Sequence, residues 1–247
     1  ASMIHLGLDI FPWAHWQTQA AALKLHTLLS LKTFAPTWMA LTEAGFPEQK
    51  SLDLIAVESG AFYIMDRAYL DFPRLGRWHQ AGAYFVVRSL DNINFRVLKS
   101  CPVDKRTGLR CDQQIRLLRF QTRRAYPHIL RRVRIYDEEH QQSLVLLSNY
   151  LTLSATTIGL LYRKRWQVEL FFKWIKQHLK LKVFLGRSQN AVRSQVWAAV
   201  CAYLLVILAK KHFALPHTLH RILQTVSISP FEQLPLSELL AETPKDR

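Results

Sequence analysis

The sequence predicts an α/β fold, and three observations along the chain favour it. Residues 1–91 alternate strand-like and helix-like stretches, residues 92–148 contain short apolar runs between charged residues, and residues 149–247 have helical patterns. Hydrophobic residues make up 49% and charged residues 21% of the 247 positions, a balance typical of a folded domain and not of a disordered chain. We therefore expect one main domain with a substantial core.

The elements before residue 92 are predicted mainly from the period of apolar positions. Alternation in "MIHLGLDIF", "LKLHTLLSLK" and "TWMALTE" predicts three antiparallel strands joined by turns. A buried strand is then expected at residues 62–65, a helix at about 71–80 and a further strand at 84–88. These last three elements form a strand, helix, strand unit.

Residues 92–148 predict a β-rich segment with a strongly basic surface. Its strand candidates are "NFRVLKS", "DQQIRLLRF", "LRRVRIYD" and "SLVLLSN". Arginines on these strands, such as Arg131, Arg132 and Arg134, are suited to follow a phosphate backbone. An ordinary solvated sheet face is the alternative.

Three helices are expected after Asn149. Ser154 is the predicted N-cap of a long helix that runs to about Lys182, a second helix covers 189–213, and a third begins near His217. The apolar run "VWAAVCAYLLVILA" is shorter than the roughly 20 residues that cross a bilayer and is followed by two lysines. We interpret it as a buried core helix, with a membrane segment as the alternative.

The charge favours a polyanionic partner. Lys and Arg total 33 against 18 Asp and Glu, which gives a net charge of +15 and makes nucleic acid the leading candidate. The alternative is a basic protein without such a partner. The three cysteines, Cys101, Cys111 and Cys201, have neither zinc-ligand spacing nor an even count, so a reducing cytoplasm is expected. No signal peptide is visible, and because the chain begins with Ala1 we expect upstream residues to be missing.

A polar stripe marks the first of the predicted helices. At about 100° per residue, Tyr162, Arg165, Glu169 and Lys176 share a stripe roughly 60° wide, with Lys173 at its border. The rest of the circumference is largely apolar, so the stripe is expected to face a cleft or a polar partner. Either Arg165 or a divalent metal would satisfy the Glu169 carboxylate, and the spacing leaves both open.

A second carboxylate stands at the end of a predicted strand. Asp66 follows the apolar run "AFYIM", and ligands of open α/β sheets collect at the carboxyl ends of strands. Asp66 and Glu169 together are the parts of a hard-cation site that leaves room for substrate phosphates. Such sites support phosphoryl transfer with two metals. The alternative is that Asp66 serves only as a helix cap.

These residues resemble a known family. The spacing of Tyr162, Arg165, Glu169 and Lys176 is similar to the Tyr-Arg-Glu-Lys signature of the insertion-sequence-four group of bacterial DDE transposases. Nearly the whole chain shares this resemblance, in the stretches "FPWA", "KLHTLL", "MDRAYLDFPRL", "TGLRCDQ" and "VELFFKWIKQHLKLKVFLGRSQNAV".

The resemblance implies an α/β fold with a ribonuclease-H-like catalytic core, a β-rich insertion and a helical C-terminal part. The implied domains are the first part of the core at 1–91, the basic insertion at 92–148, the rest of the core with the signature helix at 149–215, and a helical tail at 216–247. The implied function is metal-dependent DNA cleavage and strand transfer in transposition.

The family's functional residues carry over to specific positions. Asp66 and Glu169 correspond to the second and third members of the catalytic triad, which holds two Mg²⁺ ions, with Mn²⁺ as a substitute. Tyr162, Arg165 and Lys176 correspond to residues that grip DNA near the cleavage site. The implied partners are the element ends and target DNA, bound by a homodimer in the bacterial cytoplasm, with no membrane involved.

One position departs from the family pattern. The first Asp of the triad falls on Ala1; His5 and Asp9 are nearby substitutes, but the neutral imidazole of His5 is not an equivalent of a bridging carboxylate. We therefore expect a truncated or decayed copy. Two alternatives remain: a DNA-binding remnant without catalysis, and a nuclease of the same fold that hydrolyses without strand transfer.

Overall fold

The computed structural model describes residues 1–6, 10–17, 20–90, 92–138, 141–178 and 184–228, together with residues 235, 238 and 240. It divides into two compact units. Unit 1 contains residues 1–45 and 168–247, and unit 2 contains residues 46–167. These boundaries differ from those expected at residues 92 and 149, which stay a prediction.

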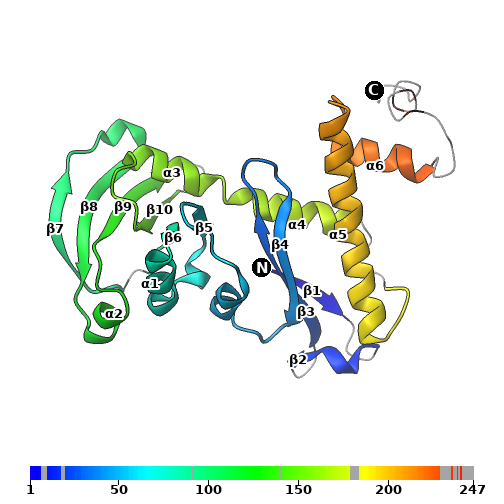
Figure 1. The fold of residues 1–247 in the computed structure, drawn as a ribbon, viewed down its shortest axis with the longest axis horizontal. Coiled ribbons are helices and arrows are strands. Elements are labelled where there is room, and N and C mark those ends of the chain that lie inside the picture. Colours follow the sequence, from blue (N-terminus) through cyan, green and yellow to red (C-terminus); the bar gives the residue numbers. More distant parts are fainter. Residues whose placement is uncertain are drawn as a thin grey trace. The chain divides into compact units, whose positions relative to one another are not determined.

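Unit 2 is built on one six-stranded sheet of mixed direction (Figure 1). Its strand order is β5-β6-β10-β9-β8-β7, in which β5 and β6 are parallel and the other neighbours are antiparallel. The strands are β5 (Phe62–Met65), β6 (Tyr84–Arg88), β7 (Phe95–Cys101), β8 (Leu109–Leu117), β9 (Leu130–Asp137) and β10 (Gln142–Ser148). The strands predicted within 92–148 thus extend the same sheet as β5 and β6.

Helices cover both faces of this sheet. Helix α3 (Ala155–Arg163) packs its Ile158 against Val86 and Val133, both of which are fully buried. Helices α1 (Phe72–Gln80) and α2 (Phe120–Ala125) pack on the other face, where the rings of Trp78 and Tyr63 lie 4.6 Å apart. Because residues alternate between faces along a strand, both faces of this sheet contribute a core.

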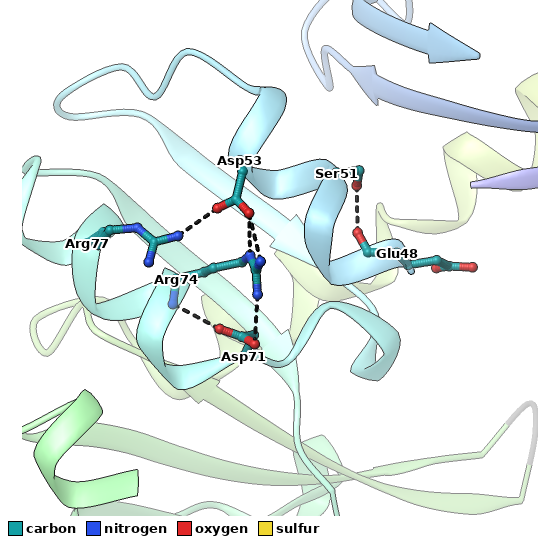
Figure 2. A network of polar contacts seen from close by, with 6 residues as sticks. All are labelled: Glu48, Ser51, Asp53, Asp71, Arg74 and Arg77. Atoms are coloured by element: carbon teal, nitrogen blue, oxygen red, sulfur yellow. Dashed lines mark hydrogen bonds and ion pairs between the residues drawn. The ribbon is translucent and has the colours of Figure 1, made fainter. Parts of the chain in front are cut away.

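Ion pairs fix the start of α1 (Figure 2). The Asp71 carboxylate caps the helix by accepting the Arg74 backbone N–H at 3.0 Å. The Arg74 guanidinium reaches Asp53 at 2.7 Å, and Arg77 reaches the other oxygen of Asp53 at 2.6 Å. Asp53 thereby ties the 3-10 helix η2 (Glu48–Leu54) to α1. The remaining 3-10 helices are η1 (Pro12–Ala14), η3 (Arg67–Tyr69) and η4 (Lys105–Thr107).

Unit 1 combines an antiparallel sheet with helices. Strands β1 (Ser2–Leu6), β2 (His15–Gln17) and β4 (Pro36–Glu43) all pair with β3 (Ala20–Leu29), which confirms the antiparallel pairing predicted there. The core of this unit joins the sheet to helices α4 and α5. Its helical members include Phe171, Ile175, Val192 and Val196. The helix bounds are α4 (Trp166–His178), α5 (Gln189–His212) and α6 (Leu219–Ile228).

The long helix predicted from Ser154 is interrupted. Ser154 does cap α3 by accepting the Thr157 N–H at 3.0 Å, but α3 ends at Arg163 and α4 begins at Trp166. Between them the Arg165 N–H donates to the Tyr162 carbonyl, three residues back, at 3.0 Å. A bond of this tighter type breaks the α-helical register. The predicted stripe therefore spans two helices, and the predicted end near Lys182 falls outside the described residues.

Helix α5 has the length and apolar composition of a bilayer span, and 39% of its most apolar window is buried. Its Val192, Val196 and Tyr203 lie in the core of unit 1, as expected for the core helix predicted from this run. Length and composition are weak grounds for a membrane span, because core helices share both.

Candidate functional site

Asp66 lies at the carboxyl end of β5, at the start of η3. Its Oδ1 accepts the Arg67 backbone N–H at 2.7 Å, so the residue does serve as a helix cap. Within the described part of the chain, no hydrogen bond or ion pair is recorded for Oδ2. A partly buried carboxylate with one oxygen held and the other open suits a hard cation, so the cap and a metal role are compatible.

Tyr162 approaches Asp66 from α3. Its side chain is only 5% exposed, and its hydroxyl donates to Asp66 Oδ1 at 3.4 Å. Burial, and next the Asp66 carboxylate, raise the pKa of Tyr162 to about 12, so the hydroxyl keeps its proton at neutral pH. We expected a DNA contact here. The buried ring places the hydroxyl near Asp66 Oδ1, and the DNA contact stays a prediction.

Arginines line a cavity beside this pair, entirely within unit 2. The register pairs Met65 of β5 with Val87 of β6, so Asp66 and Arg88 follow at the same edge of the sheet. Arg88, Arg163 and Arg165 line a cavity of about 670 Å³ that also reaches Tyr162. The Arg165 guanidinium carbon lies 5.6 Å from the centre of the Tyr162 ring. The cavity is suited to a phosphate backbone, although Asp137 and Glu138 border it on the β9–β10 side.

Arg131 and Arg132 alternate on β9 and have different surroundings. Arg131 is 8% exposed, pairs with Asp112 through two hydrogen bonds at 2.7 and 2.8 Å, and donates to the carbonyls of Leu151 and Leu153. Its donors are thus used inside the protein, which does not fit the DNA contact we expected. Arg132 is half-buried and lines a cavity, so it is accessible.

The remaining predicted residues belong to α4 in unit 1. Glu169 and Lys176 are half-buried, Lys173 is exposed, and burial lowers the pKa of Lys176. Asp66 and Glu169 thus belong to different units. In the parts of the chain that the structure describes, no group of three or more His, Cys, Asp or Glu residues is arranged to hold a metal ion. Ala1 precedes β1, His5 is exposed on it, and Asp9 lies outside the described residues.

Comparison with known proteins matches residues 9–205 to the family described as the transposase DDE domain. The chain belongs to this family. It is 32% identical to a Sinorhizobium fredii protein that carries the name transposase y4zB, over 81% of this chain and 56% of that protein. It is 30% identical to a Geobacillus stearothermophilus protein named as the transposase of insertion sequence element IS5377, over 83% of this chain and 54% of the relative.

A third DDE relative, from Synechocystis, is named as the transposase of element IS4SA and is 27% identical over 58% of this chain and 39% of its own length. The family confirms the resemblance seen in the sequence, and with it the ribonuclease-H-like core and a general dependence on divalent metal. The chain spans about half the length of the first two relatives.

The sequence patterns did not single out two residues that line the cavity beside Asp66. Arg163 directly follows the signature Tyr162, and Arg88 ends an otherwise apolar strand, "YFVVR". A cation at the end of a buried strand parallel to the one that ends in Asp66 is a detectable signal, because both ends meet at one edge of the sheet.

Proposed function

We propose that this chain is the catalytic part of a transposase that cleaves DNA at the ends of an insertion sequence and joins them to a target. The observation that carries the proposal is Asp66 at the carboxyl end of β5, beside a cavity with three arginines, in a chain of the DDE family. DNA is the proposed partner, bound by a homodimer in the bacterial cytoplasm.

In this proposal each side chain has a separate task. Arg88, Arg163 and Arg165 bind the phosphates on either side of the scissile bond, as planar guanidiniums suit phosphate oxygens. Tyr162 donates to Asp66 Oδ1, which would leave Oδ2 available to a metal ion. Lys173 and Lys176, which belong to α4, bind further phosphates of the DNA backbone.

Asp66 and Glu169 would hold the metal, for which we propose two Mg²⁺ ions with Mn²⁺ as a substitute. When bound, such ions activate the attacking oxygen and stabilise the leaving oxygen of the phosphodiester. The open oxygen of Asp66 fits this group. In this proposal the first Asp of the family pattern falls on Ala1, so one ligand position would lack a carboxylate.

Ala1 also favours a second candidate, a chain that binds DNA without cutting it. Loss of one metal ligand commonly costs several kcal/mol of transition-state stabilisation, whereas the arginine-lined cavity does not depend on it.

Nicking of a supercoiled plasmid that carries element ends, in Mg²⁺ or Mn²⁺, separates the two candidates. Three proteins are compared: the chain itself, a version with Ala1→Asp and the preceding residues of the Geobacillus relative, and that version with Glu169→Gln. We expect cleavage only by the version that has the added Asp and Glu169. Cleavage by the chain itself, lost with Glu169→Gln, would show that Ala1 is not the position of the first ligand. DNA binding without cleavage by any of them would establish the binding-only candidate.

A further inference from the structure

The sheet of unit 2 carries a second basic cavity, on the face opposite Asp66. Arg132 and Arg134 alternate along β9 with Val133 and Ile135, which pack with α3 and Tyr162 in one core cluster. Because neighbouring residues of a strand point to opposite faces, the two arginines point away from α3. They line a cavity of about 230 Å³ together with apolar residues and with Ser89 and Ser143.

In the described part of the chain, the two guanidiniums of this cavity contact neutral groups. Arg132 donates to the side-chain oxygen of Gln113 at 2.9 Å and to the Cys111 sulfur at 3.1 Å, and it lies over the Phe95 ring at 4.9 Å. Arg134 is exposed and lies 3.5 Å from the Ser143 hydroxyl. These partners are neutral, and among the residues that the structure describes no carboxylate lines this cavity, whereas Asp137 and Glu138 line the cavity beside Asp66. Arg132 is therefore a preorganised, charged donor.

The arrangement suits a nucleic-acid backbone better than a free anion. Two residues apart on one strand, the arginines are separated by roughly 6.6 Å along the chain and can contact successive groups of an extended polyanion. Leu90 and Phe95 provide apolar walls against which sugars can pack. A DNA strand bound beside Asp66 would lie on the other face of the sheet.

We propose that Arg132 and Arg134 bind the phosphate backbone of a second DNA segment, on the sheet face opposite the cleavage site. This inference rests on the proposed function, because it requires a first DNA on the Asp66 face. A transposase must hold an element end and a target together, and two opposed basic faces allow one unit to hold both.

The test is a bridging assay with the full chain. One DNA duplex is immobilised, protein is added, and capture of a labelled second duplex is measured beside the affinity for a single duplex. Arg134→Glu should lower second-duplex capture at least about tenfold while single-duplex affinity falls by less than about threefold, since the Asp66 face is unchanged. Arg88→Glu should weaken single-duplex affinity. Arg134→Lys should retain capture, because it keeps the charge.

Arg116→Glu is the matched control, because Arg116 is also exposed but does not line either cavity. Equal loss in Arg116→Glu and Arg134→Glu would show that net charge alone matters and would overturn the inference. Single-duplex binding without any second capture by the unchanged chain would overturn it while leaving the proposed function intact. No DNA binding at all would overturn both. Displacement of the second duplex by a polyglutamate peptide at lower concentration than by free DNA would assign the face to an acidic protein.

Discussion

At the scale of single residues, the residues that the signature spacing groups together have different surroundings in the structure. Tyr162, Arg165, Glu169 and Lys176 share a predicted stripe, yet Tyr162 is buried against the sheet and its hydroxyl points to Asp66. Arg165 faces the cavity over the Tyr162 ring. One residue of the signature therefore contacts the carboxylate, and Arg165, one turn away, lines the cavity.

The role of Tyr162 is testable by removal of its hydroxyl. We expect Tyr162→Phe to change the free energy of unfolding by less than about 1 kcal/mol, because the bond is long, whereas Tyr162→Ala should cost about 3–5 kcal/mol through the cavity it leaves. In the version with the first Asp added, Tyr162→Phe should reduce nicking at low Mn²⁺ and recover at high Mn²⁺. A loss that no Mn²⁺ concentration restores would argue against an orienting role.

His26 should make the stability of unit 1 depend on pH, in a direction that its pKa defines. Burial, then the charge of the amino group at Ala1 and last the charge of Lys24 lower the pKa of His26 from 6.5 to about 4. Below pH 6.5 the unfolded chain binds a proton that the folded chain binds only below about pH 4. Stability should therefore fall as the pH drops through this window, by up to about 1.4 kcal/mol per pH unit.

Urea unfolding of the chain and of His26→Gln between pH 4 and 7 checks this expectation. Gln can keep the contact that His26 makes with the Thr42 hydroxyl at 3.0 Å, but it does not titrate. The difference in unfolding free energy between the two proteins should grow steadily toward acid pH. A difference that stays constant would refute the assignment.

At the scale of elements, Arg131 of β9 forms a buried ion pair with Asp112 of β8 and also contacts the segment that leads into α3. Arg131 and Asp112 are 9% and 7% exposed at their side chains, and Arg131 also donates to the carbonyls of Leu151 and Leu153. Arg131 thus connects β9 to residues 151–153, which precede α3. It positions the helix that carries Tyr162.

Removal of one partner of this pair should be costly. Asp112→Ala leaves a buried guanidinium without its carboxylate and is expected to destabilise the protein by about 3–5 kcal/mol. Asp104→Ala is the control, since its pair with Arg106 is exposed at 48% and 90% of the two side chains and its loss should have little effect. Similar melting temperatures for the two variants would contradict the structural role.

At the scale of the whole molecule, the net charge of +15 makes the binding of DNA depend on salt. Each phosphate contact releases a counterion, so the slope of log K against log salt counts the contacts. We expect Arg88→Ala and Lys176→Ala each to reduce the magnitude of this slope by about 0.9. Lys50→Ala, which removes an exposed charge on η2, should leave the slope unchanged. Equal slopes for all three variants would mean that the charge acts only as a diffuse field.

The sequence by itself determined most of the elements, the family and the position of Asp66 at a strand end. Period-two alternation located β3, β5, β6 and the strands of 92–148, and the hydroxyl of Ser154 caps its helix as predicted. These signals succeed because they act within a few residues of one another. Four residue types at fixed gaps were likewise enough to indicate the family.

Only the tertiary structure decided which face of each strand is buried. Alternation places Arg131 and Arg132 on opposite faces, but only the tertiary structure brings Asp112 and the Leu151 and Leu153 carbonyls to the buried Arg131 and leaves Arg132 accessible. The parallel pairing of β5 with β6, which brings Arg88 beside Asp66, joins residues 22 positions apart. The strand, helix, strand pattern indicates such a pairing, but the face on which each side chain lies depends on how the whole sheet buries its surface.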